Sequence, residues 1–346
     1  MLKYSIKRII LAIITAFIIL TLTFFLVKSL PPRGVVSPDD NVRWAFYVNE
    51  ENLGYVIHTA VETPEYGKVL EQFTVDGKDY FFYQRPVFDQ YISWLGNIVT
   101  KWDWGTSTVI KPGVPTIKII GERIPFTLQV NVIAVLISVP LGIALGIFAG
   151  LKKNTWIDHT ISTLVMIFIS IPSFVVISFM IYFFAFKGNL PIVWPDPDQS
   201  AGVKALGFII PVLALSFGSI CGYCRFVRAE LCEVMSSEYL LLARTKGLTK
   251  SQAITRHALR NAFVPILPSI LAEVIGVFSG SMILENLYNI HGIGDLYITA
   301  LNQANPDYNV LMVDMAIVTT IGLLANVVLD LSYGFIDPRI RMGEKK

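Results

Sequence analysis

The sequence predicts an all-α polytopic membrane protein with six transmembrane helices, cytoplasmic N and C termini, and a small β-containing extracytoplasmic domain between helices 1 and 2. Composition points to the membrane first. Hydrophobic residues make up 53% of the 346 residues and charged residues only 16%, whereas soluble domains carry about 25% charged residues. The second observation is a series of apolar runs that approach or exceed the ~20 residues needed to cross ~30 Å of hydrocarbon. The third is an uneven distribution of basic residues between the loops.

Six apolar runs are predicted to span the membrane. The first, Ile9–Val27, follows three basic residues and has no clear small-residue cleavage site after it, so we interpret it as a retained signal-anchor helix. In the third run, Pro172 is expected to kink the helix, because neighbouring helices can satisfy the carbonyl that proline frees. The five later spans are Pro125–Phe148, Ile157–Phe186, Ala205–Val227, Phe263–Leu284 and Val310–Ile336.

The basic residues give the orientation. With the N-terminus inside, the inner segments contain 16 Lys and Arg, against 2 in the short outer loops. Because Lys and Arg favour the cytoplasmic side, both termini are predicted to be cytoplasmic. The predicted domains are an N-terminal transmembrane helix (1–28), an extracytoplasmic domain (29–122), a five-helix core (123–337) with a cytoplasmic loop (229–262), and a cytoplasmic tail (338–346).

The predicted extracytoplasmic domain is polar and rich in aromatic residues. Asp76-Gly77 lies between two β-forming runs, which is a strong signal for a β-hairpin over Phe73–Phe82. Phe88–Val99 is expected to form a short amphipathic helix near the membrane surface, and Trp94, Trp102 and Trp104 would suit the interfacial aromatic belt. The three cysteines lie in or just after one apolar segment and are interpreted as small hydrophobic residues.

Several functions are not supported by any motif in the sequence. There is no phosphate-binding glycine-rich motif, and Gly292-Ile-Gly294 lacks the third glycine of a dinucleotide fingerprint. The four histidines are scattered, and no nucleophile–base pair emerges. A net charge of +2 gives no indication of nucleic-acid binding. We therefore expect no enzyme activity, no catalytic residue, no metal site and no cofactor bound by this chain.

The most distinctive stretch is the basic loop Glu238–Pro268. Ser237 is expected to cap a first helix, and Gly247 to end it. Thr249 to Gln252 matches a capping box that starts a second helix running through Arg260. This helix–glycine–helix unit looks too short to bury its own apolar side chains. Two interpretations stay open: a linker resting on anionic lipid, or a segment that docks in a groove of a soluble partner.

Polar residues inside the spans are candidates for a pathway. A carboxylate within the membrane costs a few kcal/mol, so Glu273 and Asp314 are functional hypotheses. Asp158 and Asp330 lie near span ends and are expected to be solvated. Glycines at helical spacing, such as Gly142 and Gly146, mostly indicate close helix packing. The candidate pathway residues are Asn131, Ser138, Glu273, Asp314 and Asn326.

The loop resembles that of ABC-importer permeases of the oligopeptide/dipeptide/nickel branch. Ala243-Arg244-Thr245-Lys246-Gly247-Leu248 and Arg256-His257-Ala258-Leu259-Arg260-Asn261-Ala262 are similar to two motifs of that branch. The more general Glu-Ala-Ala signature matches less well, since Leu241-Leu242 stand in place of Glu-Ala. Further similar stretches are Asp103-Trp104-Gly105-Thr106-Ser107, Glu122 to Leu128, Ser170 to Phe174, Tyr288 to Gly294 and Asp337 to Arg341, whereas residues 40–86 resemble an insertion.

The resemblance implies a function and a set of partners. The chain would be the first of two paired permease subunits of a peptide importer in the bacterial cell membrane, forming half of the translocation pathway. Its partners would be a second homologous permease, two cytoplasmic ATPases that bind ATP and Mg²⁺, an extracytoplasmic peptide-binding protein and membrane lipid. The implied ATPase-coupling residues are Tyr239, Leu242, Ala243, Arg244, Lys246, Gly247, Leu248, Arg256, His257, Arg260 and Asn261.

Other functions stay open at this point. The same signatures occur in permeases for nickel and for oligosaccharides. An ion-coupled secondary transporter using Glu273 and Asp314 is a further alternative, although it would predict internal repeats with broken helices. A membrane-anchored receptor with residues 28–122 as its sensing domain would leave the cytoplasmic loop unexplained.

Overall fold

The computed structural model describes residues 2–30, 37–301 and 305–336. Among these described residues, four helices are long and apolar enough to cross a membrane, or up to six if each of two bent helix pairs is counted as one span. The prediction of a helical, multi-span membrane protein is therefore confirmed, while the count of six depends on how the bent pairs lie in the membrane. The tail predicted over 338–346 and the similar stretch at Asp337 to Arg341 fall outside the described residues.

The chain forms two compact units. The first comprises residues 1–10, 126–290 and 322–346, and the second comprises residues 11–125 and 291–321. Three long helices, α1 (Leu2–Lys28), α4 (Thr116–Leu151) and α15 (Tyr308–Ile336), contribute to both units. The remaining helices of the first unit are α5 (Trp156–Ile169), α6 (Ser173–Met180), α7 (Ala201–Gly207), α8 (Ile209–Met235), α9 (Glu238–Thr245), α10 (Lys250–Ala253), α11 (Leu259–Phe263), α12 (Ile266–Gly276) and α13 (Met282–Leu287).

Glycines bring α4 and α8 into close contact in the first unit. A Cβ added at Gly142 would lie 2.9 Å from the Ile220 carbonyl oxygen, and one at Gly146 would lie 2.8 Å from the Cys224 carbonyl oxygen. Real Cβ atoms do not approach backbone this closely, so only glycine permits the crossing. The predicted packing role of these two glycines is confirmed.

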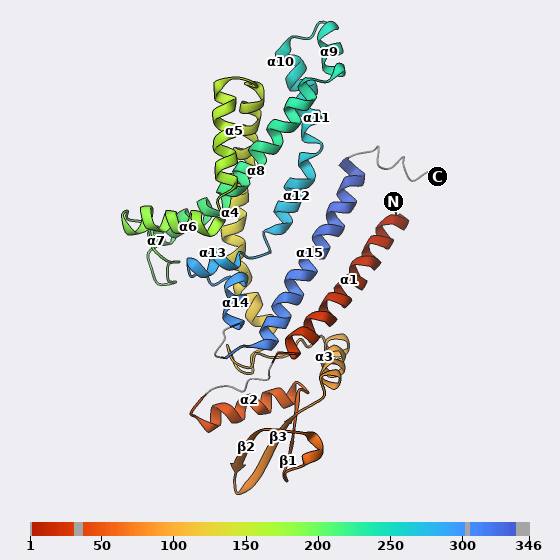
Figure 1. Cartoon of the computed structure of the whole chain (residues 1–346), viewed down its shortest axis with the longest axis vertical. Helices are drawn as coiled ribbons and strands as arrows, with labels where there is room; N and C mark the ends of the chain where they lie inside the picture. Colours follow the sequence, from red (N-terminus) through yellow and green to blue (C-terminus); the bar gives the residue numbers. More distant parts are fainter. Residues whose placement is uncertain (1, 31–36, 302–304, 337–346) are drawn as a thin grey trace. The chain divides into compact units, whose positions relative to one another are not determined.

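The third predicted span is broken more sharply than the sequence suggested. Instead of one kinked helix over Ile157–Phe186, α5 ends at Ile169 and α6 begins at Ser173, with a bend of 97° between the pair. Pro172 is the N-cap of α6 and has no N–H to continue the α5 ladder. The pair ends in a π-helical segment, Ile181–Phe186, and Figure 1 shows α5 and α6 pointing in different directions.

The fifth predicted span is also interrupted. The span predicted over Phe263–Leu284 is not a single helix, because α12 ends at Gly276 and α13 begins only at Met282. At its other end, α12 follows the segment 250–263 with a bend of 52°, next to Pro265. Two glycines, Gly276 and Gly280, and serines at 279 and 281 surround the interruption, and these residues have low helix propensity.

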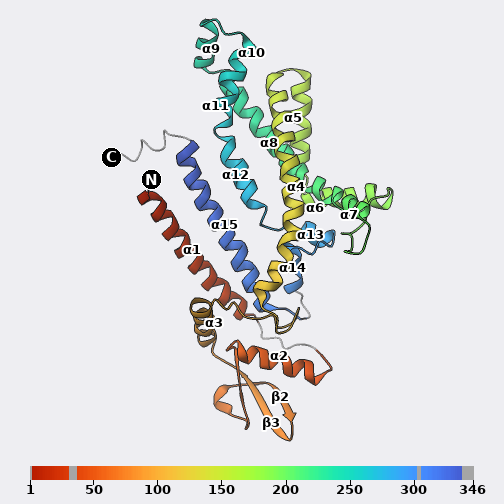
Figure 2. The same cartoon turned by 180° about the vertical axis from the view of Figure 1, so that it is seen from behind.

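A three-stranded antiparallel sheet lies in the second unit. Its strands are β1 (Val56–Thr59), β2 (Val69–Val75) and β3 (Lys78–Gln84), in the order β1-β3-β2. The predicted hairpin is confirmed: Val75 pairs with Lys78, and both turn residues, Asp76 and Gly77, have positive φ. Helix α2 (Asp40–Asn52) lies alongside this sheet in both views (Figures 1 and 2). Tyr47 and Trp44 from α2 pack on the sheet residues Phe73 and Phe82.

A second core joins α1, α3 and α15. Phe24 of α1 is fully buried, and its ring lies 5.1 Å from Trp94 and 5.4 Å from Tyr91, both on α3 (Val87–Lys101). The helix predicted over Phe88–Val99 is thus confirmed, while its place near the membrane surface stays a prediction. Trp94 is only 5% exposed, so its predicted place in an interfacial belt is wrong: the indole is needed to fill this core. Helix α14 (Ile293–Ala300) completes the unit with Leu296 and Ala300.

The loop between α3 and α4 is fixed by one buried carboxylate. Asp307 accepts hydrogen bonds from the Ser107 hydroxyl at 2.6 Å and from the Val109 and Ile110 amides at 3.0 Å. Gly105 has φ +81, and a Cβ there would lie 2.7 Å from the side-chain nitrogen of Asn309. These contacts explain the Asp-Trp-Gly-Thr-Ser stretch as a loop that closes on the start of α15.

Candidate coupling surface and polar cavity

Helix α9 and the segment after it form the predicted helix–glycine–helix unit. Gly247 adopts φ +94 between them, a conformation that L residues rarely adopt. Both halves of the predicted capping box are present. The backbone N–H of Gln252 donates to the Thr249 hydroxyl at 3.2 Å, and the backbone N–H of Thr249 donates to the Gln252 side-chain oxygen at 3.1 Å. Ser237 precedes α9, but its hydroxyl donates to the Val234 carbonyl at 2.6 Å instead of capping α9.

The second helix of this unit is continuous but locally widened. It consists of α10, a π-helical turn (Ile254–Ala258) and α11. A π turn shifts the side chains that follow it relative to an ideal α-helix. Arg256 and Arg260 are nevertheless both exposed, so each guanidinium is available at the surface.

The apolar side chains of the unit are buried together with α8. Leu240 is 5% exposed and clusters with Ala253, Ala258 and Ala262 of the unit, and with Leu231 of α8. The small alanine side chains let α9 approach the second helix closely. This agrees with the expectation that the unit is too short to bury itself alone.

The outward face of the unit contains the predicted coupling residues. Leu241 and Leu242 remain 63% and 56% exposed, and Tyr239 is 41% exposed. Such large exposed apolar side chains next to basic residues are typical of a contact site. The exposed members of the predicted set are Tyr239, Leu242, Arg244, Lys246, Gly247, Arg256, His257, Arg260 and Asn261, while Ala243 and Leu248 are half-buried.

Three of the five predicted pathway residues line one polar cavity in the first unit. Asn131 and Ser138 from α4 and Glu273 from α12 border a cavity of about 220 Å³. The Ser138 hydroxyl donates to Glu273 at 3.4 Å, and the Asn131 amide donates to the Val277 carbonyl at 2.8 Å. That carbonyl lies just past the end of α12, so Asn131 also satisfies backbone exposed by the interruption.

The cavity has further polar lining that the sequence did not single out. Ser219 comes from α8, and Ser279 and Ser281 come from the segment after α12. Serines are common in membrane helices for packing reasons, so composition alone gave no signal for these positions. Asp314 and Asn326 do not line this cavity: Asp314 is a buried residue of the second unit, and Asn326 is exposed in the first.

Asp158 differs from expectation, because it is fully buried instead of solvated. Its carboxylate is bonded by two guanidinium nitrogens of Arg228, one of them at 2.8 Å, and by the Asn154 amide at 2.9 Å. A buried carboxylate needs this full set of partners. The pair links α5 to α8. Asp330, by contrast, is partly exposed and pairs with Arg8 at 2.9 Å.

In the part of the chain that the structure describes, no three His, Cys, Asp or Glu residues are grouped so as to hold a metal ion. The three cysteines are free and buried. The helix–glycine–helix unit offers an exposed surface for contact, and the cavity offers polar groups for solvation of a polar solute.

Comparison with known proteins places these features in a family. The model of the family described as binding-protein-dependent transport system inner membrane component matches residues 142–342. The dipeptide transport system permease protein DppB of Lactococcus lactis is 30% identical over 99% of this chain and 100% of its own length. The oligopeptide transport system permease protein OppB of Escherichia coli K12 is also 30% identical, with the same coverage.

A solved structure supports the fold. The MetNI methionine ABC transporter, in inward-facing conformations, contains a chain that matches with a TM-score of 0.51 and 15% identity, over 64% of this chain and 97% of that one. The match to the family model covers more than half of this chain, and the relatives match over nearly their full length. This chain therefore belongs to the family of inner membrane components of binding-protein-dependent transport systems.

Proposed function

We propose that this chain is a permease subunit of a peptide importer, the first of a pair of permeases, and that ATP hydrolysis takes place on separate cytoplasmic subunits. Support for peptides comes from the relatives, which are dipeptide and oligopeptide permeases aligned from end to end. Within the proposal, residues 29–122 lie outside the cell and can receive a peptide-binding protein. The helix–glycine–helix unit from Glu238 to Phe263, which we call the coupling unit, lies in the cytoplasm.

The observation that carries the coupling role is the exposed apolar face of α9. Leu242 and Tyr239 stand on a unit whose own core is already filled by Leu240. Removing such side chains from water stabilises a contact by about 1.5–3 kcal/mol each when they are fully buried. Arg244 and Lys246 flank this face and can add charge-assisted hydrogen bonds to a partner. Through a contact at this face, movement of an ATPase subunit would be transmitted to the membrane helices.

The cavity next to Glu273 is proposed as part of the translocation pathway. Peptide groups need hydrogen-bonding partners when they leave water. Ser138, Glu273 and Asn131 supply both donors and acceptors along one side of α4 and α12. The alternative of ion coupling through Glu273 and Asp314 together is less well supported, since only Glu273 lines this cavity.

The proposal is tested by capture of partners. We expect the full chain with an affinity tag at its C-terminus to co-purify with two ATPase subunits and a second permease. Leu242→Glu places a charge in the contact and should reduce the ATPase recovered by at least tenfold, without loss of the chain from the membrane. Val61→Glu, at a position 73% exposed in the second unit, is the matched control and should recover the ATPase normally.

Two results would contradict the proposal. One is normal ATPase recovery with Leu242→Glu. The other is a tagged chain that transports its substrate with no ATPase attached. In proteoliposomes, the captured complex should take up a labelled dipeptide in an ATP-dependent way. Uptake of nickel or of an oligosaccharide instead would show that the substrate is not a peptide.

A further inference from the structure

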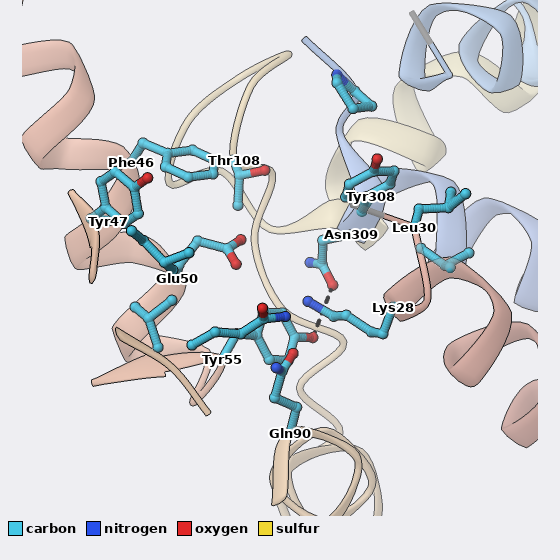
Figure 3. Close-up of a pocket in the computed structure, with 15 residues that line it drawn as sticks. Lys28, Leu30, Phe46, Tyr47, Glu50, Tyr55, Gln90, Thr108, Tyr308 and Asn309 are labelled. Carbon is cyan, nitrogen blue, oxygen red and sulfur yellow. Dashed lines mark hydrogen bonds between the residues drawn. The ribbon is translucent and has the colours of Figure 1, made fainter. Parts of the chain in front are cut away.

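A second cavity lies in the unit that contains the sheet. Its volume is about 60 Å³, and it is enclosed by the end of α1, by α2, by α3 and by the start of α15. Figure 3 shows the charged and polar side chains around it. Its lining includes the polar side chains of Lys28, Glu50, Tyr55, Gln90 and Asn309. All belong to the same unit, and none is used by the proposed pathway or coupling surface.

The two charged groups of this cavity do not meet. The Lys28 ammonium lies 3.4 Å from the centroid of the Tyr55 ring. Among the described residues, the ion pairs within 4 Å include neither Lys28 nor Glu50. Opposite charges in a closed space normally pair directly, because desolvation is costly. In Figure 3 the Glu50 carboxylate and the Lys28 side chain point towards a common space.

Burial makes the ionised form of Glu50 unfavourable. Desolvation raises the pKa of the Glu50 carboxyl, and the charge of Asp307 raises it further, while Lys28 lowers it. A cation placed directly against this carboxylate would supply the interaction that Lys28 gives only from a distance.

Gln90 provides an independent sign of a missing partner. It is 1% exposed, and its amide nitrogen donates to the Arg85 carbonyl at 2.8 Å. Its side-chain oxygen has no hydrogen-bond partner, and Figure 3 shows the side chain directed towards Tyr55 and the cavity. Buried acceptors without a donor are rare and need an explanation. Here a donor inside the cavity would satisfy the oxygen.

We propose that this cavity binds a small zwitterion of the amino-acid class, with its ammonium at the Glu50 carboxylate and the Gln90 side-chain oxygen and its carboxylate at the Lys28 ammonium. Such a ligand neutralises both charges at once and satisfies the orphan acceptor. The Tyr55 ring and hydroxyl, the latter 3.4 Å from the Asn309 side-chain oxygen, form one wall. The volume fits an amino acid with a small side chain better than it fits a peptide.

Ordered water is the competing occupant, since the cavity exceeds the ~10–15 Å³ that one water needs. The two occupants differ in a measurable way, because only a ligand stabilises the fold in proportion to its concentration. L-alanine is the probe, and glycine should act in the same way. Acetate and methylammonium each carry one half of the zwitterion, and alanyl-alanine tests whether a dipeptide also fits.

The experiment is thermal unfolding and calorimetric titration of the full chain in nanodiscs. L-alanine is expected to raise the unfolding temperature and to bind with one site per chain, whereas acetate and methylammonium should bind at least tenfold more weakly. Glu50→Gln should weaken L-alanine binding at least tenfold. Glu51→Gln is the matched control, because Glu51 is the neighbouring acid and its carboxylate faces His58 at 2.8 Å instead of the cavity.

A second variant keeps the proposal testable if Glu50→Gln fails to fold. Gln90→Met removes the orphan acceptor with little change of volume, and it also removes the hydrogen bond to the Arg85 carbonyl. The two effects oppose each other, so the stability of the unliganded protein should change little. Its affinity for L-alanine should fall at least fivefold. The proposal is overturned if L-alanine gives no shift with the unchanged chain, if Glu51→Gln weakens binding as much as Glu50→Gln, or if Gln90→Met leaves the affinity unchanged.

Discussion

At the scale of single residues, the ion pair between Asp158 and Arg228 has the largest expected effect on stability. Asp158 is fully buried, and the guanidinium of Arg228 supplies two of its hydrogen bonds. Breaking a buried pair on one side costs about 3–5 kcal/mol, because the other charge stays buried without compensation. The pair joins α5 to α8 in the first unit, so its loss acts on the packing of two helices.

We expect Arg228→Met to lower the thermal stability of the detergent-solubilised chain strongly, whereas Asp158→Leu combined with Arg228→Met should recover much of the loss. Fluorescence-detected size exclusion after heating measures this directly. Arg8→Met is the control, since the Arg8–Asp330 pair is partly exposed and such pairs contribute little. Equal losses for Arg228→Met and Arg8→Met would show that burial of the pair does not matter.

Sequence patterns at the level of single residues predicted only some of the contacts described above. The glycines of α4 were recognisable from their spacing, since small residues at i and i+4 indicate close packing. Asp158 was not, because its position near the end of an apolar run suggested solvent, and its partner Arg228 is 70 residues away. Glu50 and Lys28 gave no signal for the same reason: their meeting point is created by tertiary structure.

At the scale of elements, the turn at Gly247 is the natural place to disturb coupling. Its φ is +94, and a Cβ there would meet nothing within 4 Å. Gly247→Ala therefore strains the backbone without a clash inside the chain, at a cost of about 1–3 kcal/mol. We expect this strain to alter the angle between α9 and the second helix, so that transport per ATP hydrolysed falls severalfold in the reconstituted complex.

The hairpin offers a matched control for this substitution. Gly77 has φ +73 and equally open surroundings, so Gly77→Ala carries similar strain in a different unit. Transport per ATP should stay near that of the unchanged complex. If transport per ATP falls similarly in both variants, the effect is due to general destabilisation. If it does not fall in Gly247→Ala, the turn at Gly247 has no role in coupling.

Local chemistry explains which elements were predictable. The hairpin and the capping box depend on residues two or three positions apart, and both were predicted from the sequence. The bends next to Pro172 and Pro265 were harder, since proline permits anything from a kink to a break, and tertiary packing decides which one forms. The hydroxyl of Ser237 donates a hydrogen bond to the Val234 carbonyl instead of capping α9, and serine often makes such a local bond.

At the scale of the whole molecule, the number of membrane crossings follows from how the bent pairs lie. If α5 and α6 together cross the membrane, residues 152–155 and 187–200 are on opposite sides. If the 97° bend makes them re-entrant, both segments are on the same side. Charge counting favours the crossing, since the basic loop Glu238–Pro268 after α8 then lies in the cytoplasm.

Cysteine labelling measures this topology with little engineering. The native cysteines are buried, so single cysteines introduced at exposed positions should dominate the reaction. We expect an impermeant maleimide to label Gln199→Cys in intact cells, and to label Lys153→Cys only after the membrane is opened. Labelling of both variants under the same condition would rule out the six-span topology.

Overall class was the most predictable property, because hydropathy and charge are sums over many residues and tolerate local errors. The family followed from motifs in the coupling unit and was confirmed by full-length relatives. The cavity next to Glu273 was only partly predictable: Asn131, Ser138 and Glu273 come together there, while Asp314 does not.

The carboxylate of Asp307 also sets an order of events during synthesis. The loop around Ser107 to Ile110 leaves the ribosome about 200 residues before the acceptor that its amides require. Until α15 begins to emerge, those amides have only water as a partner, and loop closure over such a distance carries a large entropic cost. The second unit is therefore finished late, when nearly all of the chain has been made, although most of its residues are among the first to be translated.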